Sequence, residues 1–265
     1  MAHPETLFRD IEVTSSEIGI RKIGVRDLWK SLQEGYEDFN AKPSFGIFLT
    51  VIYPLFALLL TLFVLGDNLH HLVFPTLAGL TLLGPVVSVG LFAMSRRRER
   101  GLELTWRSAF DFVHSHSFAP IAALSVVMAL LYAAWLFMAQ FIYTGLFGAH
   151  PPVSFAAFVH ELTTTRHGGA LIFYGIGVGA MFAFTALAIS VFAFPLLLDK
   201  PTTMLTAVGT SIRAMTTNCV VILIWGAVVV VSLAVGASLF LIGLAAVLPI
   251  LGHATWHLYR KVVES

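Results

Sequence analysis

Two histidines near the C-terminus, His253 and His257, have the residue type and the spacing that could bind a metal ion or a haem iron. They are four residues apart, so a helix would place both rings on one face. His114 and His116 are expected on the same side of the membrane and could complete a cluster. The alternative is structural, because the sequence offers no carboxylate or thiolate beside the pair that would complete a metal site.

The structural alternative groups these histidines with neighbouring aromatic and basic residues. Trp256 and Arg260 lie in the same run, Gly252–Arg260, and Trp29 and Trp106 are expected at the same face of the membrane. Aromatic rings and cations of this kind form belts that fix the depth of helices in a bilayer. We therefore favour an interfacial belt or a hydrogen-bonded cluster over a haem or metal site.

The rest of the sequence contains no recognisable catalytic motif. It has no Ser-His-Asp order, no HExxH and no Walker loop, and its single cysteine, Cys219, excludes an internal disulfide and CxxC redox chemistry. The long apolar runs contain no Asp, Glu, Lys or Arg, whereas proton relays and ion coupling within a membrane use such residues. We predict a protein that is not an enzyme and has no resident cofactor.

The elements that must position these residues are membrane helices, because 57% of the residues are hydrophobic and only 12% are charged. A spanning helix needs about 20 apolar residues. The last apolar run, Asn218–Tyr259, is about twice as long as one span requires, so we expect it to fold back at Gly236–Ser238. The sequence thus predicts six spans, the first four being Ser44–Leu65, Leu72–Ser95, Ala119–Phe147 and Gly168–Leu198.

The positions of the basic residues predict how these spans are oriented. With six spans, all 16 Lys and Arg residues except Arg166 lie on one side, whereas five spans would move Arg260 and Lys261 to the other. Basic residues stay on the cytoplasmic side and contact anionic lipid head groups, so the run Arg96–Arg100 indicates lipid contact and not nucleic-acid binding. We therefore expect a multi-pass protein of the bacterial cytoplasmic (inner) membrane, with both termini in the cytoplasm.

The predicted domain organisation is simple. Residues 1–24 are a polar N-terminal segment that we expect to be flexible, 25–261 form a single six-span membrane domain, and 262–265 are a C-terminal tail. The fold class is an all-α polytopic membrane protein with its six spans in three hairpins.

An amphipathic segment precedes each predicted hairpin on the cytoplasmic side, at 25–39, 102–113 and 205–215. Apolar residues recur at helical spacing in each segment, so we expect three helices lying in the membrane surface. Trp29 and Trp106 stand at equal distances before Pro43 and Pro120, which suggests a threefold internal repeat. The alternative is chance, because any membrane protein with amphipathic connectors shows part of this pattern.

Prolines and glycines within the spans predict where helices bend or approach closely. Prolines at positions 54, 85, 195 and 249 remove backbone hydrogen bonds and tend to kink their spans, which can open a cavity or be filled by packing. Gly175 and Gly179 have the GxxxG spacing that lets another helix approach, either within the subunit or in a homodimer.

The run Gly252–Arg260, together with Phe194–Asp199 and Ser211–Asn218, resembles a bacterial family of integral membrane proteins catalogued as domain of unknown function 2189. The resemblance extends from about residue 25 onward. Some members are labelled as cytochrome c oxidase subunits. The resemblance extends that label to this chain as a name and not as an activity. A haem-copper catalytic subunit needs several histidines deep within its spans, whereas every histidine here is predicted near or outside a membrane surface.

Three functions follow from these patterns. The first is a non-enzymatic accessory, assembly or membrane-organising protein, with lipid and another membrane protein as partners. The label of some family members would place it beside a respiratory oxidase. The second is a facilitator or binding protein for a lipid or small apolar solute, with a cavity between kinked spans. The third is a haem- or metal-binding protein that uses His253 and His257.

Overall fold

The computed structural model describes residues 18–67, 69–105, 109–148, 151–239 and 243–264. Every regular element within these ranges is a helix. In chain order the helices are α1 (Val25–Ala41), α2 (Pro43–Gly66), η2 (His70–Leu72), α3 (Val73–Leu80), η3 (Thr81–Leu83), α4 (Gly84–Val87), α5 (Val89–Glu99), η5 (Asp111–His114), α6 (Phe118–Phe147), α7 (Phe155–Thr164), α8 (Arg166–Ser190), α9 (Ala193–Asp199), α10 (Met204–Thr217), α11 (Cys219–Ser238) and α12 (Leu244–Val262).

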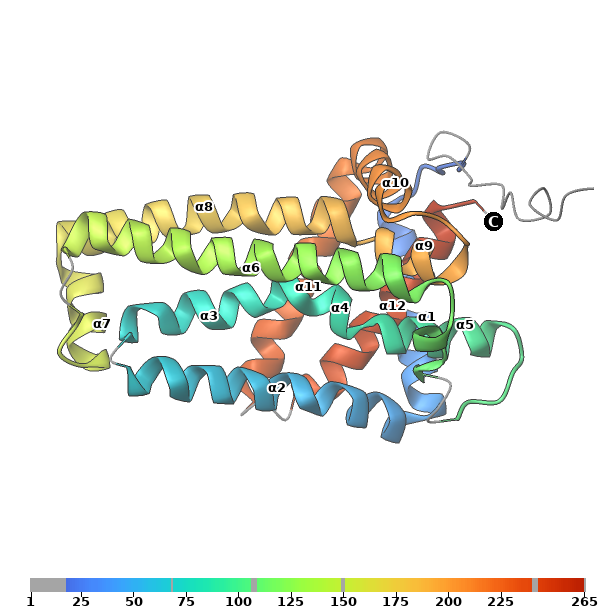
Figure 1. The fold of residues 1–265 in the computed structure, drawn as a ribbon, viewed down its shortest axis with the longest axis horizontal. Helices are drawn as coiled ribbons and strands as arrows, with labels where there is room; N and C mark the ends of the chain where they lie inside the picture. Colours follow the sequence, from blue (N-terminus) through green and yellow to red (C-terminus); the bar gives the residue numbers. More distant parts are fainter. Residues whose placement is uncertain (1–17, 68, 106–108, 149–150, 240–242, 265) are drawn as a thin grey trace, which may run out of the picture.

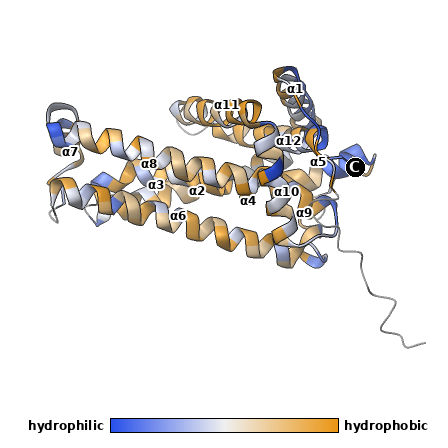
Figure 2. Cartoon of the chain, turned by 90° about the horizontal axis from the view of Figure 1, so that it is seen from above, coloured by the Kyte–Doolittle hydropathy of each residue, from blue (hydrophilic) through white to orange (hydrophobic). Residues whose placement is uncertain are grey.

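Four of the described segments are long and apolar enough to cross a membrane: His70–Glu99, Phe118–Phe147, Arg166–Asp199 and Cys219–Ser238. Val51–Gly66, within α2, is a shorter apolar helix. The helices α2, α3, α6 and α8 run along the long axis of the molecule, with α7 at one end (Figure 1). Hydrophobic residues cover the middle of this bundle, and hydrophilic residues gather at its two ends (Figure 2). We call the end formed by α1, α5, α9, α10 and the C-terminal half of α12 the rim.

Two of the four segments are interrupted close to prolines. In His70–Glu99 the helix tightens into η3 and restarts as α4, where Pro85 occupies the second position. In Arg166–Asp199 the helix breaks at residues 191–192, between α8 and α9, and α9 begins two residues before Pro195. Pro249 lies inside α12, which continues through it as one helix. Proline cannot donate a backbone hydrogen bond, which accounts for the two breaks.

A serine from a neighbouring helix satisfies the backbone at the second break. The hydroxyl of Ser211 on α10 donates to the carbonyl oxygen of Ala188 at 2.7 Å and accepts from the amide of Phe192 at 3.3 Å. Backbone groups freed by a break need such partners within a membrane protein, because lipid offers none. Ser211 and Phe192 are both fully buried, so the break is part of the packed core.

Trp135 on α6 holds α3 and α8 close to its ring. Its indole Nε1 donates to the carbonyl oxygen of Pro75 at 2.7 Å, and a side chain at Gly79 would overlap the indole. On the other side, a Cβ at Gly179 would lie 3.1 Å from the same ring, whereas Gly175 faces open space. The predicted small-residue pair therefore contributes one close contact within the subunit, at Gly179.

Two of the three predicted amphipathic segments are helical, as α1 and α10. The prediction for 102–113 was wrong at 102–105, which are not helical, and the next described element is the short η5. Gly101 has a φ of 68°, a left-handed conformation that ends α5, and Arg97 then binds the loop through the carbonyl oxygen of Glu103 and the carboxylate of Asp111. Trp106 lies outside the described residues.

Residues 18–24, which belong to the segment expected to be flexible, are hydrogen-bonded to the C-terminal end. The amide of Arg21 donates to the carbonyl oxygen of Val262 at 2.8 Å, and Ile20 and Val263 form an antiparallel bridge. Asn218, at the start of α11, binds Arg21 and Ile23. The start of α11 and the end of α12 are therefore held at the same place.

The packing around Trp135 predicts that Gly79→Ala destabilises the protein. The new methyl group would overlap Trp135 and lie about as close to the ring of Tyr132, where a built Cβ is 2.7 Å away. Overpacking of this kind costs about 1–3 kcal/mol. We expect a lower Tm in thermal unfolding of the detergent-purified protein.

Gly175→Ala is the matched control, because a Cβ there meets nothing within 4 Å. Alanine is the better helix former by up to about 1 kcal/mol, so this variant should keep or raise the Tm. A Gly79→Ala protein as stable as Gly175→Ala would contradict the packing described for Trp135.

Candidate functional site

The helix α1 packs against α12 with a face that is partly polar. The buried residues of α1 are Leu28, Ser31, Gly35 and Asp38. By contrast, the side chain of Trp29 is 63% exposed, on the apolar face that the sequence predicted. At 3.6 residues per turn the two faces are about a quarter of a turn apart. The polar seam therefore faces protein, and much of the apolar face points outward.

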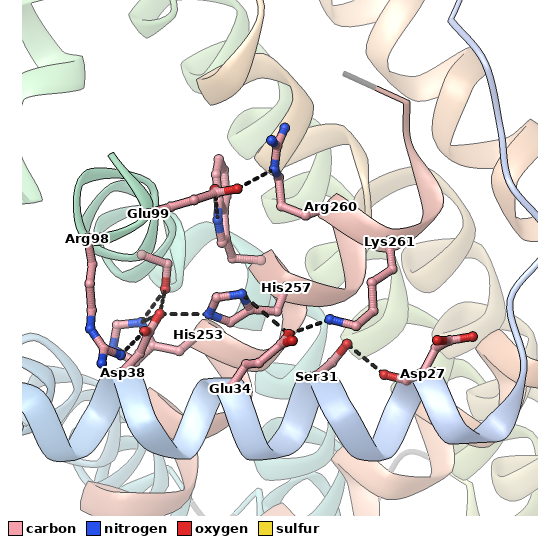
Figure 3. Close-up of polar contacts among 12 residues, drawn as sticks. Asp27, Ser31, Glu34, Asp38, Arg98, Glu99, His253, His257, Arg260 and Lys261 are labelled. Carbon is pink, nitrogen blue, oxygen red and sulfur yellow. Dashed lines mark hydrogen bonds and ion pairs between the residues drawn. The ribbon is translucent and has the colours of Figure 1, made fainter. Parts of the chain in front are cut away.

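The centre of this seam is the carboxylate of Asp38, which is only 6% exposed (Figure 3). Its Oδ2 accepts hydrogen bonds from the hydroxyl of Ser95 at 2.5 Å and from Nε2 of His257 at 2.9 Å, and Oδ1 is ion-paired with Arg98. Nδ1 of His253 lies 2.7 Å from the hydroxyl oxygen of Ser95. One carboxylate thus joins α1, α5 and α12, which are far apart in sequence. We call Asp38, Ser95, Arg98, His253 and His257 the Asp38 cluster.

The Asp38 cluster contains serine, histidine and aspartate, but its geometry differs from that of a catalytic triad. Ser95 donates its proton to Asp38, so its hydroxyl accepts the Nδ1–H of His253 and no histidine is placed to remove the serine proton. Ser95 and His253 are also buried, at 1% and 2% exposure. The arrangement holds helices together, and the sequence pattern gave no indication that Asp38 and Ser95 meet.

Several hydrogen bonds stabilise the charged form of Asp38. Burial raises the pKa of this carboxyl, but the hydrogen bonds from His257 and Ser95 and the nearby His253 outweigh that effect and lower the pKa from 3.8 to about 2. Asp38 is therefore expected to stay ionised over the whole physiological range.

Two further sets of charges lie beside this cluster. Lys261 is ion-paired with Glu34, which extends the contact between α1 and α12. On the other face of α12, Arg260 binds Glu99 at 2.9 Å, and the buried indole of Trp256 donates to the same carboxylate. Trp256 is thus part of the core at the rim and does not lie in a lipid-facing belt.

The four histidines singled out in the sequence do not come together as one metal centre. Within the described ranges, no group of three or more His, Cys, Asp or Glu side chains is arranged to hold a metal ion. His253 and His257 are engaged by Ser95 and Asp38, whereas His114 ends the separate short helix η5 and His116 follows it.

An apolar cavity of about 540 Å³ lies inside the bundle, between the segment around Pro85 and helices α8, α11 and α12. Its buried floor includes Phe92, Trp225 and Leu251, and its exposed edge includes Phe184 and Val230. Ligand pockets in proteins typically measure about 300–1,000 Å³ and are mostly apolar. We call this space the intramembrane cavity.

The polar groups of the intramembrane cavity are four hydroxyls and the indole N–H of Trp225, and no charged residue or histidine is among the described residues that line it. Each hydroxyl donates to a carbonyl oxygen of its own helical segment: Thr81 to Ala78, Ser88 to Gly84, Ser190 to Ala186 and Thr255 to Leu251. The hydroxyl groups are therefore already hydrogen-bonded, and the remaining polar group of the described lining is the indole N–H of Trp225.

Residues 73–199 match the family described as predicted integral membrane protein, DUF2189. The match covers slightly less than half of the chain. The DUF2189 segment runs from α3 to α9 and supplies the α4, α5 and α8 walls of the intramembrane cavity, whereas α11 and α12 lie beyond it. The run Gly252–Arg260, which carries part of the sequence resemblance to this family, is outside the matched residues. No curated protein and no solved structure matches the chain.

The lowered pKa of Asp38 predicts that α1 loosens from α12 in acid. A carboxyl group whose pKa is lower in the folded state stabilises that state above its unfolded pKa, and the contribution disappears as the pH falls through the folded pKa. For Asp38 this window runs from about pH 4 to about pH 2 and corresponds to about 2 kcal/mol. A spin label attached at Gln33→Cys, on the exposed face of α1, should become more mobile as the pH falls through this window. The native Cys219 is replaced by serine so that only one site is labelled.

Asp38→Asn is the control for this titration, because the amide cannot ionise. Its label should already be mobile at neutral pH and should show no transition between about pH 4 and pH 2. The interpretation would be wrong if the two proteins gave the same pH profile.

Proposed function

We propose that the chain crosses the bacterial inner membrane six times, with α2 and α12 as spans beside the four segments named above and with both termini in the cytoplasm. The start of α11 and the end of α12 share contacts with Arg21–Ile23, and a Cβ at Gly243 would lie 2.7 Å from the carbonyl oxygen of Gly236. This is the geometry expected of an antiparallel hairpin. The basic residues at the rim support a cytoplasmic location for it.

The function we propose is binding of a lipid or small apolar molecule in the intramembrane cavity. The observation that carries this proposal is an apolar space of about 540 Å³ that borders the proline-interrupted segment and contains no charged lining residue among those described. A charged solute would lose its hydration there without gaining a partner, whereas an apolar molecule would lose nothing. This proposal includes no catalysis and no cofactor.

A second candidate function is that of an accessory, assembly or membrane-organising protein. It is favoured by the outward face of α1, where Trp29 and Tyr36 are exposed and the basic residues Arg26 and Lys30 lie nearby. Because the polar seam of α1 is occupied by α12, this face is available to the bilayer surface and its anionic head groups, or to another membrane protein. Both functions are compatible with one molecule.

Photolabelling tests the binding function directly. We expect a small alkyl diazirine, added to the purified protein in detergent, to label residues of α8 and α11 that border the intramembrane cavity. Ala183→Phe should strongly reduce this labelling, because Ala183 is an exposed residue at the edge of the cavity and a benzyl group would fill its opening.

Ala134→Phe is the matched control, since Ala134 is exposed on α6 and does not line the cavity. It should leave the labelling unchanged. Equal labelling of the wild type and Ala183→Phe, or labels spread evenly over the outer surfaces of all helices, would refute binding in the cavity.

A further inference from the structure

The position of the intramembrane cavity along the bundle indicates what kind of apolar molecule it holds. Its lining on the first broken segment extends from Thr81 to Phe92, and its lining on α8 and the residue that follows it extends from Ala180 to Val191. Each stretch corresponds to about 16 Å at 1.5 Å per residue. A bilayer core is about 30 Å thick, so the cavity spans about one leaflet.

The cavity lies in the leaflet next to the rim. Phe92 is four residues, or about 6 Å, before Arg96. The chain runs toward the rim in two other walls as well. Val191 precedes Asp199, and Thr255 precedes Arg260; Asp199 and Arg260 are rim residues. The end of the cavity nearest the rim is therefore about one to two helical turns from the charged surface, where lipid head groups of that leaflet would lie.

The opening of the cavity faces sideways, between α8 and α11. Residues of both helices at this edge are exposed, including Ala183 and Phe184 on α8 and Leu223 and Val230 on α11, whereas Phe92 and Trp225 at the floor are buried. Toward the rim the core is closed by buried side chains such as Phe194. A ligand would enter from the hydrocarbon of the bilayer.

We infer that the ligand is an acyl chain, which enters laterally between α8 and α11 from the leaflet next to the rim and lies against Trp225. This inference rests on the proposed binding function and names its ligand class. At roughly 30 Å³ for a water-sized group, a volume of about 540 Å³ has room for about 18 such groups, which is comparable with one long chain. The chain could belong to a phospholipid or to a free fatty acid.

The test uses Trp225 as a probe in the full-length protein reconstituted into vesicles. In phosphatidylcholine brominated at the middle of its chains, bromine quenches tryptophans that touch the chains. We expect a quenched component that is missing in Trp225→Phe, even though Trp225 is only 1% exposed. This component should be lost in Ala183→Phe and kept in Ala134→Phe, which is the matched control.

A second arm separates the two sources of the chain. Brominated fatty acid is added to vesicles of unbrominated phosphatidylcholine, and quenching of Trp225 there alone would assign the site to free fatty acid. If neither reagent quenched Trp225 while the diazirine still labelled the cavity, the acyl-chain inference would fail and the binding function would stand. If the diazirine labelling also failed, both would be refuted.

Discussion

The carboxylate of Asp38 is the interaction on which the rim of this protein depends. It is buried where α1, α5 and α12 meet, and a buried carboxylate is stable only when hydrogen bonds and opposite charges replace its hydration. Ser95, His257 and Arg98 supply these partners. Because two of them come from α5 and the third from α12, the requirement to satisfy one charge on α1 fixes how the first helix sits on the last.

That contact also determines which surface of α1 faces outward. In a water-soluble protein the apolar face of a helix turns inward, whereas in α1 Ser31 and Asp38 face α12 and Trp29 faces out. A lipid surface reverses the usual preference, since apolar side chains lose nothing there and polar groups need protein partners. The intramembrane cavity follows the same logic, because its hydroxyl groups are satisfied by their own helices and its walls present mostly apolar surface.

The sequence was a good guide to the class of protein and a poor guide to the site. Long uncharged runs predicted the apolar helices because lipid excludes charge, and Pro85 and Pro195 marked real interruptions. The sequence identified His253 and His257 but not their partners, because hydrogen bonds between residues distant in sequence leave no periodic pattern. The spacing of Leu28, Ser31, Gly35 and Asp38 was a usable signal, since it matches the period of a helix seam. The apolar stripe of α1 is a stronger pattern and was interpreted first. In a membrane protein such a stripe can be the face of the helix that contacts lipid instead of protein.

The central claim is that the polar seam of α1 is docked on α12, and one disulfide tests it most directly. A Cβ at Gly35 would lie 2.8 Å from the Cβ of Ala254 and 2.5 Å from its backbone nitrogen, and a disulfide needs a Cβ–Cβ distance of about 3.8 Å, so the helices must move apart locally by about 1 Å for the bond to form. The measurement is the cross-linked fraction of Gly35→Cys/Ala254→Cys in a Cys219→Ser background, in native membranes after mild oxidation. We predict nearly complete cross-linking, and none with Gln33→Cys in place of Gly35→Cys, because Gln33 is exposed on α1. Equal cross-linking of the two pairs, or none with either, would contradict the account.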